Sequence, residues 1–197
     1  MSQEREFDIV VHGATGFTGK RVVLDILQTA QAAFPERTLR VAIAGRSQER
    51  LERLLQELPP SRIEPKIVIA DTSNAEQLVE MCRRSKVCIA CAGPFRFLGE
   101  PVVKACVETG CHYVDITGEP EFFEKMGFVY HELAKTTGTC VVNSCGMDSI
   151  PCDMGVQYTR QQLETVHQAL PSSISMYFKL HVTGQAGVAG HFATYES

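Results

Sequence analysis

Six short apolar runs alternate with longer stretches of mixed polar and apolar residues along the first three quarters of the chain. The runs occupy residues 7–11, 41–44, 67–70, 87–91, 113–116 and 140–142. Near-continuous apolar runs that alternate with helical patterns are typical of a parallel sheet covered by helices on both faces. The pattern therefore predicts an α/β fold with a doubly wound parallel sheet, complete near residue 145.

The stretches between the runs carry signals for helix ends. Residues 73–76, Ser-Asn-Ala-Glu, match a capping box that opens a helix. Pro101 and Pro120 suit first helical positions, and Gly110 and Gly138 suit the position after a helix end. Each predicted strand after the first is therefore preceded by a crossover helix.

A glycine-rich turn joins the first apolar run to the helix after it. The turn consists of Gly13, Ala14, Thr15, Gly16, Phe17, Thr18 and Gly19. In a strand–turn–helix unit of this kind, backbone N–H groups and the helix N-terminus bind the pyrophosphate of a dinucleotide. A P-loop is excluded because five residues separate Gly13 from Gly19 and Arg21 follows Lys20. We predict a Rossmann-type fold; a turn that serves only strand–helix packing is the alternative.

The end of the second run indicates which dinucleotide is bound. Arg46 and Ser47 follow this run, with no acidic residue at its tip. An arginine here pairs with the 2′-phosphate of NADP, whereas an acid favours NAD. We predict NADP, with NAD as the alternative; in the competing interpretation Ser47 caps the next helix and Arg46 is solvated. Asp71, after the third run, either contacts the adenine edge or caps a helix.

The fourth run is followed by a turn of small residues. This turn contains Cys91, Ala92, Gly93 and Pro94. Small residues at this place let the ribose and nicotinamide of the cofactor lie against the backbone, where the strand order reverses. We predict that the turn binds the cofactor; a plain strand-terminating turn is the alternative.

Two later loops carry carboxylates and hydroxyls. Hydride transfer needs a proton donor or acceptor beside the reacting carbon. The candidates are Asp115, Asp148, Ser149 and Asp153, and each aspartate is alternatively a helix cap or turn former. No lysine stands four residues after Tyr113, Tyr130 or Tyr158, which argues against a short-chain dehydrogenase.

The pattern changes beyond residue 150. Residues 157–168 predict a helix, and the alternating run at residues 174–182 predicts a strand. About fifty residues are too few for an independent core. We expect a dinucleotide-binding domain at residues 1–150, followed at residues 151–197 by the beginning of a truncated α+β substrate domain. A flexible tail on a complete protein is the alternative.

Composition and charge limit the classes of binding partner and the cellular location that we expect. The net charge of −4 and the lack of a basic cluster argue against nucleic acid, and no apolar run approaches the ~20 residues that span a bilayer. The polar, acidic start is unlike a signal or transit peptide, so we expect a cytoplasmic protein. Its eight cysteines are then reduced thiols. Metal or redox chemistry at the Cys88–Cys91 pair is the alternative; we predict no metal site.

These motifs together give the chain a family resemblance. It resembles the saccharopine dehydrogenase-like oxidoreductases, including animal members and the bacterial trans-acting enoyl reductases. The shared motifs lie at residues 13–19, 44–47, 91–95, 118–120 and 146–153. The last of these, Gly-x-Asp-Ser-x-Pro-x-Asp, is the most specific. True saccharopine reductases carry Gly-x-Asp-Pro-Gly-x-Asp-His at this place, so the departure argues against saccharopine as the substrate.

The resemblance implies an NAD(P)-dependent oxidoreductase. Its substrate would be a small lipid-like or amino-acid-like molecule whose imine or activated double bond is reduced. The resemblance also implies a peripheral location on lipid droplets, and we expect that the protein can form a homodimer. Because no acid–base residue is unambiguous, a non-catalytic dinucleotide-binding regulator or scaffold is the alternative.

Overall fold

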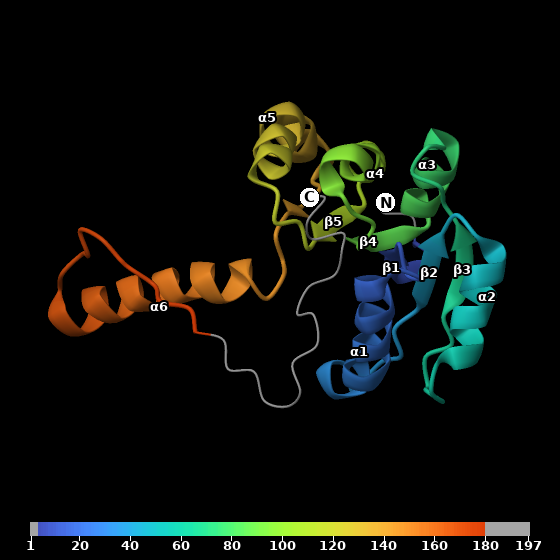
Figure 1. The fold of residues 1–197 in the computed structure, drawn as a ribbon, viewed down its shortest axis with the longest axis horizontal. Helices are drawn as coiled ribbons and strands as arrows, with labels where there is room; N and C mark the ends of the chain where they lie inside the picture. The colour runs from blue at the N-terminus through green and yellow to red at the C-terminus, as the bar shows by residue number, and fades with distance from the viewer. Residues whose placement is uncertain (1–3, 180–197) are drawn as a thin grey trace.

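The apolar runs form a six-stranded parallel sheet in the computed structural model of the chain, which describes residues 4–179. The strands are β1 (Phe7–His12), β2 (Val41–Gly45), β3 (Lys66–Ile69), β4 (Ser85–Ala90), β5 (His112–Asp115) and β6 (Val141–Val142). Their order is β3-β2-β1-β4-β5-β6 (Figure 1). The strand order reverses between β1 and β4, which is where sheets of this kind bind ligands. The predicted doubly wound sheet is confirmed.

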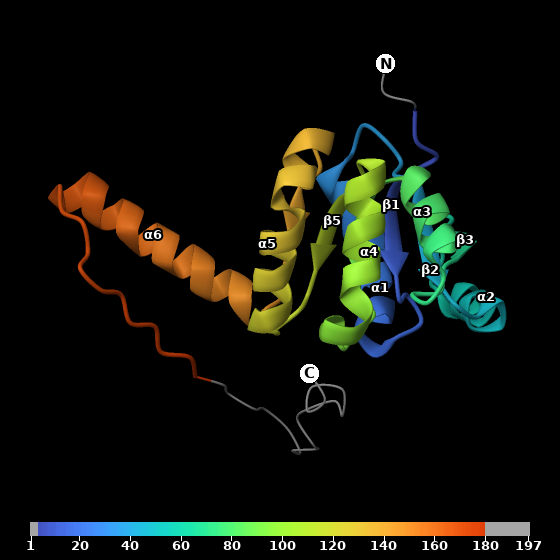
Figure 2. The same ribbon diagram turned by 90° about the horizontal axis from the view of Figure 1, so that it is seen from above.

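Helices cover both faces of the sheet. In chain order the helices are α1 (Phe17–Ala33), α2 (Gln48–Glu57), α3 (Ala75–Arg83), α4 (Phe95–Thr109), α5 (Pro120–Thr137) and α6 (Ser149–His167), of which α1–α5 cover the sheet. Helices α1 and α2 pack on one face, and α3, α4 and α5 on the other (Figures 1 and 2). Val10 belongs to the apolar core under α3–α5, and Val11 belongs to the core under α1 and α2. Successive residues of a strand point to opposite faces, so each face has its own core.

Three predicted helix starts are wrong. The cap of α3 is Asn74 rather than Ser73, because the Asn74 side chain accepts a hydrogen bond from Gln77 N at 3.1 Å. Pro101 lies inside α4 instead of opening it. Helix α6 begins at Ser149, eight residues before the predicted start. Helix α4 starts at the carboxyl edge of the sheet, where the Glu119 carboxylate of another loop accepts hydrogen bonds from its first two N–H groups.

The other predicted helix ends are confirmed. Pro120 is the first residue of α5, while Gly110 and Gly138 follow α4 and α5 in the left-handed conformation with φ of +71° and +68°. Cys91 lies just beyond β4 rather than within it.

The part of the chain after β6 leaves the sheet. Helix α6 projects away from it in both views, and none of its residues is buried (Figures 1 and 2). Residues 174–179 form no strand, and residues 180–182 of the predicted strand lie outside the described residues. Within residues 4–179, no helix is long and apolar enough to cross a membrane.

Candidate functional site

The turns after β1 and β4 meet at the carboxyl edge of the sheet. A Cβ atom added to Gly13 would lie 2.8 Å from the nitrogen of Ala92, so these two turns touch. The backbone N–H of Cys91 donates to the carbonyl oxygen of His12 at 2.8 Å. The structure therefore brings together the two turns that the sequence predicts for the cofactor.

Glycine is required in the turn after β1 for two different reasons. Gly13 has a φ of +77°, which side chains disfavour, and its N–H donates to the Ala44 carbonyl oxygen at 2.9 Å. A Cβ on Gly19 would lie 2.2 Å from the carbonyl oxygen of Gly13, so only glycine lets α1 pack this closely on the turn. These are the tight-turn and helix-packing roles of glycines in a dinucleotide-binding turn.

The N-terminus of α1 differs from those of its neighbours. Gly16 precedes α1 and provides no side-chain cap, whereas Ser47 caps α2 and Asn74 caps α3. The N–H groups of Phe95 and Arg96 at the start of α4 donate to a carboxylate of another loop. A helix N-terminus with no side-chain acceptor can bind a phosphate with its N–H groups. Because its N-cap residue is Gly16, α1 has no acceptor of this kind on the side chain of its own N-cap.

The candidate residues for the adenosine half lie on neighbouring strand ends. Arg46 follows β2 and is exposed, and the Ser47 hydroxyl accepts a hydrogen bond from Arg50 N at 3.4 Å. Ser47 is thus a helix cap, a role that is compatible with its predicted contact to the cofactor. Asp71 accepts hydrogen bonds from the N–H and hydroxyl of Ser73, which lower its pKa, as does the charge of Arg46 to a smaller extent. Asp71 forms a turn and does not cap α3.

His12 is a buried residue that sequence reasoning missed. It ends β1, directly before the glycine turn, and burial lowers its pKa to about 4. The imidazole is therefore neutral at pH 7. Its Nδ1 atom is buried without a hydrogen-bond partner within residues 4–179. The only signal in the sequence was the position of a histidine at the end of an apolar strand.

The β4–α4 turn is held from the loop after β5. Glu119 Oε1 accepts a hydrogen bond from Phe95 N at 2.8 Å, and Oε2 accepts one from Arg96 N at 2.7 Å. Pro94 directly precedes α4. Glu119 was not among the predicted site residues, because a contact between two loops leaves no local signal.

Asp115 lies buried at the end of β5. Its carboxylate accepts hydrogen bonds from Tyr113 Oη, Thr117 N, Asn143 Nδ2 and Ser144 N, at 2.7 to 3.1 Å. Four donors on one carboxylate make Asp115 an organiser of the surrounding loops.

The other catalytic candidates lie where α6 leaves the sheet. Asp148 precedes α6, Ser149 begins it and Asp153 follows one turn later. Asp148 and Asp153 are exposed, and Ser149 is half-buried. The start of this loop is anchored, since the Cys145 N–H donates to the carbonyl oxygen of Asp115 at 2.7 Å.

The cysteines of the described residues include Cys91, beside the glycine turn, and a group of three in the core under α3–α5. Burial raises the pKa of Cys91 to about 12, so it is a neutral thiol at pH 7. The Sγ atoms of Cys82, Cys106 and Cys111 lie within 4.8 Å of one another. Among the described residues, this is the group of side chains close enough together to hold a metal ion. All three belong to the apolar core under α3–α5, and we interpret them as core side chains.

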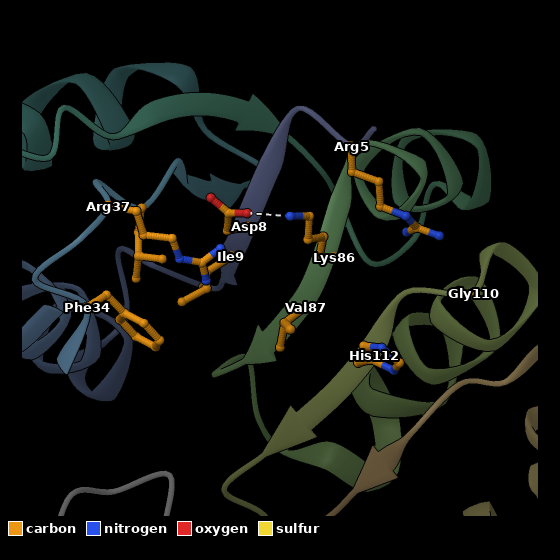
Figure 3. A pocket seen from close by; sticks show the side chains of 10 residues that line it. Arg5, Asp8, Ile9, Phe34, Arg37, Lys86, Val87, Gly110 and His112 are labelled. Carbon is orange, nitrogen blue, oxygen red and sulfur yellow. Dashed lines mark hydrogen bonds and ion pairs between the residues drawn. The ribbon is translucent and has the colours of Figure 1, made fainter. Parts of the chain in front are cut away.

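A cavity lies at the opposite edge of the sheet. Its volume is about 370 Å³, and Asp8, Arg37, Lys86 and His112 are among the residues that line it (Figure 3). Asp8 and His112 stand at the amino ends of β1 and β5. This cavity is therefore separate from the carboxyl edge and from the candidate cofactor residues.

Comparisons with known proteins agree with this geometry. Residues 9–142 match the family model described as "Saccharopine dehydrogenase NADP binding domain". The chain is 39% identical over 204 residues to the human "Saccharopine dehydrogenase-like oxidoreductase", an alignment that covers 100% of this chain and 46% of the human protein. It is 40% identical over 162 residues to the "Trans-acting enoyl reductase" of Mycobacterium leprae, covering 82% of this chain and 37% of that protein. The chain thus spans less than half the length of both relatives.

A solved structure has a similar fold. The apo saccharopine dehydrogenase (L-Glu forming) from Saccharomyces cerevisiae superposes with a TM-score of 0.59 at 18% sequence identity, over 83% of this chain and 32% of that chain. At this identity the similarity shows the shared fold alone.

Proposed function

Because this chain belongs to the saccharopine dehydrogenase NADP-binding domain family, we propose that it is the cofactor-binding part of an NADP-dependent oxidoreductase. One observation carries this proposal: the glycine turn after β1 leads into a helix without a side-chain cap and touches Ala92 of the β4–α4 turn. This is the arrangement that receives the pyrophosphate at the reversal of the strand order.

In the proposed complex the cofactor lies across the carboxyl edge from β2 to β4. The turn from Gly13 to Gly19 binds the pyrophosphate. The exposed guanidinium of Arg46 pairs with the 2′-phosphate, and Asp71 contacts the adenine edge. No acidic residue stands next to Arg46 in the sequence at the tip of β2, which favours NADP over NAD. Bound NADPH would supply the hydride.

The proposed reaction is the reduction of an imine or an activated double bond of a lipid-like or amino-acid-like substrate. The name of the M. leprae relative supports reduction of a double bond. Asp148, Ser149 and Asp153 are the proposed residues for proton transfer or substrate binding, because they follow the anchored start of the β6–α6 loop. We further propose that residues 151–197 begin the substrate domain.

A non-catalytic dinucleotide-binding regulator remains a second candidate. It is favoured by Asp115, whose carboxylate already accepts four hydrogen bonds from within the chain and so has little capacity left for a substrate. A cytoplasmic location, attachment to lipid droplets and a homodimer are predictions of the same proposal.

Two measurements test the proposed function. Calorimetric titration of the chain with NADPH and NADH should show binding, with NADPH the tighter ligand. Oxidation of NADPH by the full-length protein in the presence of an enoyl or imine substrate would separate the reductase from the regulator, which would bind NADPH without consuming it. Failure of the chain to bind either dinucleotide would contradict both candidates.

A further inference from the structure

Alternate residues after β5 form a chain of hydrogen bonds. Asp115 Oδ1 accepts from the backbone N–H of Thr117 at 3.1 Å, and Thr117 Oγ1 accepts from the backbone N–H of Glu119 at 3.1 Å. The exposed fractions of these residues are 0%, 1% and 8%. We call this set the Asp115–Thr117–Glu119 ladder.

One end of the ladder fixes the turn after β4. The two carboxylate oxygens of Glu119 accept from the N–H groups of Phe95 and Arg96. These N–H groups belong to the first turn of α4, where the helix dipole favours a negative charge. The position of Pro94, which directly precedes α4, therefore depends on Glu119.

The other end fixes the loop after β6. The Asp115 carboxylate accepts from Asn143 Nδ2 at 2.7 Å and from Ser144 N at 2.8 Å. Ser144 has a φ of +61°, a conformation that side chains disfavour, so these bonds hold a strained residue in place. The loop that starts here leads to Asp148 and Ser149.

The chemistry of the ladder requires carboxylates. Every neighbour named above presents a donor, and an ionised carboxylate is a pure acceptor. A glutamine at position 119 would turn its NH₂ group toward one of two backbone N–H groups. One buried donor would then lose its acceptor, which costs more than the loss of an ordinary exposed hydrogen bond.

We propose that the ladder positions the β4–α4 and β6–α6 loops around the nicotinamide half of the cofactor. Asp115, Thr117 and Glu119 are positioning residues, since they act through the loops they bind. The inference rests on the proposed function and assigns the two halves of the cofactor to different parts of the site. The nicotinamide half depends on the ladder, whereas the adenosine half depends on the turns after β1 and β2.

Two ligands separate these halves. NADP⁺ contains both, and adenosine 2′,5′-bisphosphate contains the adenosine half alone. Calorimetric titration of the chain and its Glu119→Gln variant should show NADP⁺ affinity reduced about tenfold, because a β4–α4 turn that is no longer held by both carboxylate oxygens must be ordered when the ligand binds. Affinity for the bisphosphate should change by less than about twofold.

Matched variants guard against a general loss of structure. Glu121→Gln removes a carboxylate from the exposed first turn of α5 and should leave both affinities unchanged. Thr117→Val keeps the side-chain shape, removes the acceptor for Glu119 N, and should repeat the effect of Glu119→Gln more weakly. It carries the test if Glu119→Gln does not fold.

The outcomes distinguish the inference from the proposed function. Equal losses for both ligands, or no loss for either, in a folded variant would overturn the ladder and leave the proposed function standing. Wild-type chain that binds neither NADP⁺ nor the bisphosphate would overturn both.

Discussion

Lys86 Nζ lies 2.8 Å from Asp8 Oδ1, an ion pair that joins the central strands β1 and β4 at the amino edge of the sheet (Figure 3). Arg40 adds a hydrogen bond from its backbone N–H to Asp8 Oδ2 at 3.0 Å. Burial of the carboxyl group opposes its ionisation, but the hydrogen bonds from Lys86 and Arg40 outweigh it and hold the pKa of Asp8 well below its usual range. The two central strands are thus tied at the edge opposite the glycine turn.

Because of this ion pair, the free energy of unfolding should depend on pH in the acidic range. The pKa of Asp8 is lower in the folded than in the unfolded chain, so its contribution is present above the unfolded value and is lost as pH falls through the folded value. We expect Asp8→Asn to reduce the free energy of unfolding by about 2 kcal/mol at pH 7. Urea denaturation at pH 7 and pH 3 should show a smaller difference at pH 3. Asp25→Asn, at an exposed site on α1, should show little difference at either pH.

Buried His12 should weaken the fold at mildly acidic pH. Its pKa is about 4 in the folded chain, below the usual value, so the unfolded chain binds more protons between about pH 6.5 and 4. Stability should fall by up to about 3 kcal/mol across this window. In His12→Asn this part of the slope should vanish, while the exposed His131→Asn should keep it. Parallel slopes for wild type and His12→Asn in urea denaturation would contradict the assignment.

Gly16 should be essential for dinucleotide binding. A valine there would project from the exposed N-cap of α1 into the approach of the pyrophosphate, and its Cβ would also lie 3.2 Å from the Gly13 carbonyl oxygen. Gly16→Val should weaken NADPH binding more than about tenfold. Gly127→Val on α5, where a Cβ meets nothing within 4 Å, is the matched control. Unchanged NADPH affinity in calorimetry would refute the pyrophosphate site.

Arg46 should determine the preference between the two dinucleotides. Arg46→Asp removes the partner of the 2′-phosphate and adds an acceptor for a ribose hydroxyl, so the ratio of NADPH to NADH affinity should fall by roughly 10- to 100-fold. Arg50→Asp makes the same change in charge on the exposed surface of α2 and should alter the ratio far less. The two dissociation constants of each variant decide the matter; an unaltered ratio would exclude the 2′-phosphate role of Arg46.

The strands and the glycine turn could be predicted from the sequence because their signals are local. The apolar run that contains Val10 and Val11 is continuous since both faces of the sheet are covered, and Gly13 is needed for the conformation of its own backbone. The ends of α4 and α5 were predictable for the same reason. Gly110 and Gly138 adopt positive φ angles that few other residues tolerate.

The contacts between loops could not be predicted in this way. Glu119 meets Phe95 across 24 positions of the chain, and Asp115 meets Asn143 across 28. Pro101 predicted a helix start because proline is favoured at the first position of a helix, whereas α4 begins at Phe95, where Glu119 accepts hydrogen bonds from the N–H groups of Phe95 and Arg96. The acceptor is the Glu119 carboxylate in the loop after β5, which lies next to the start of α4 only in the folded chain.

The departure of α6 from the sheet has a consequence for how such a protein can change over time. The residues proposed to bind the pyrophosphate and the adenosine half of the cofactor all come before residue 72, on a sheet with its own two cores. The residues proposed to face a substrate begin only where the chain turns outward, before Ser149. Mutations in the later segment can therefore alter the proposed substrate contacts without changing the proposed pyrophosphate and adenosine contacts. Members of the family could diverge in substrate in this way while they keep the same dinucleotide.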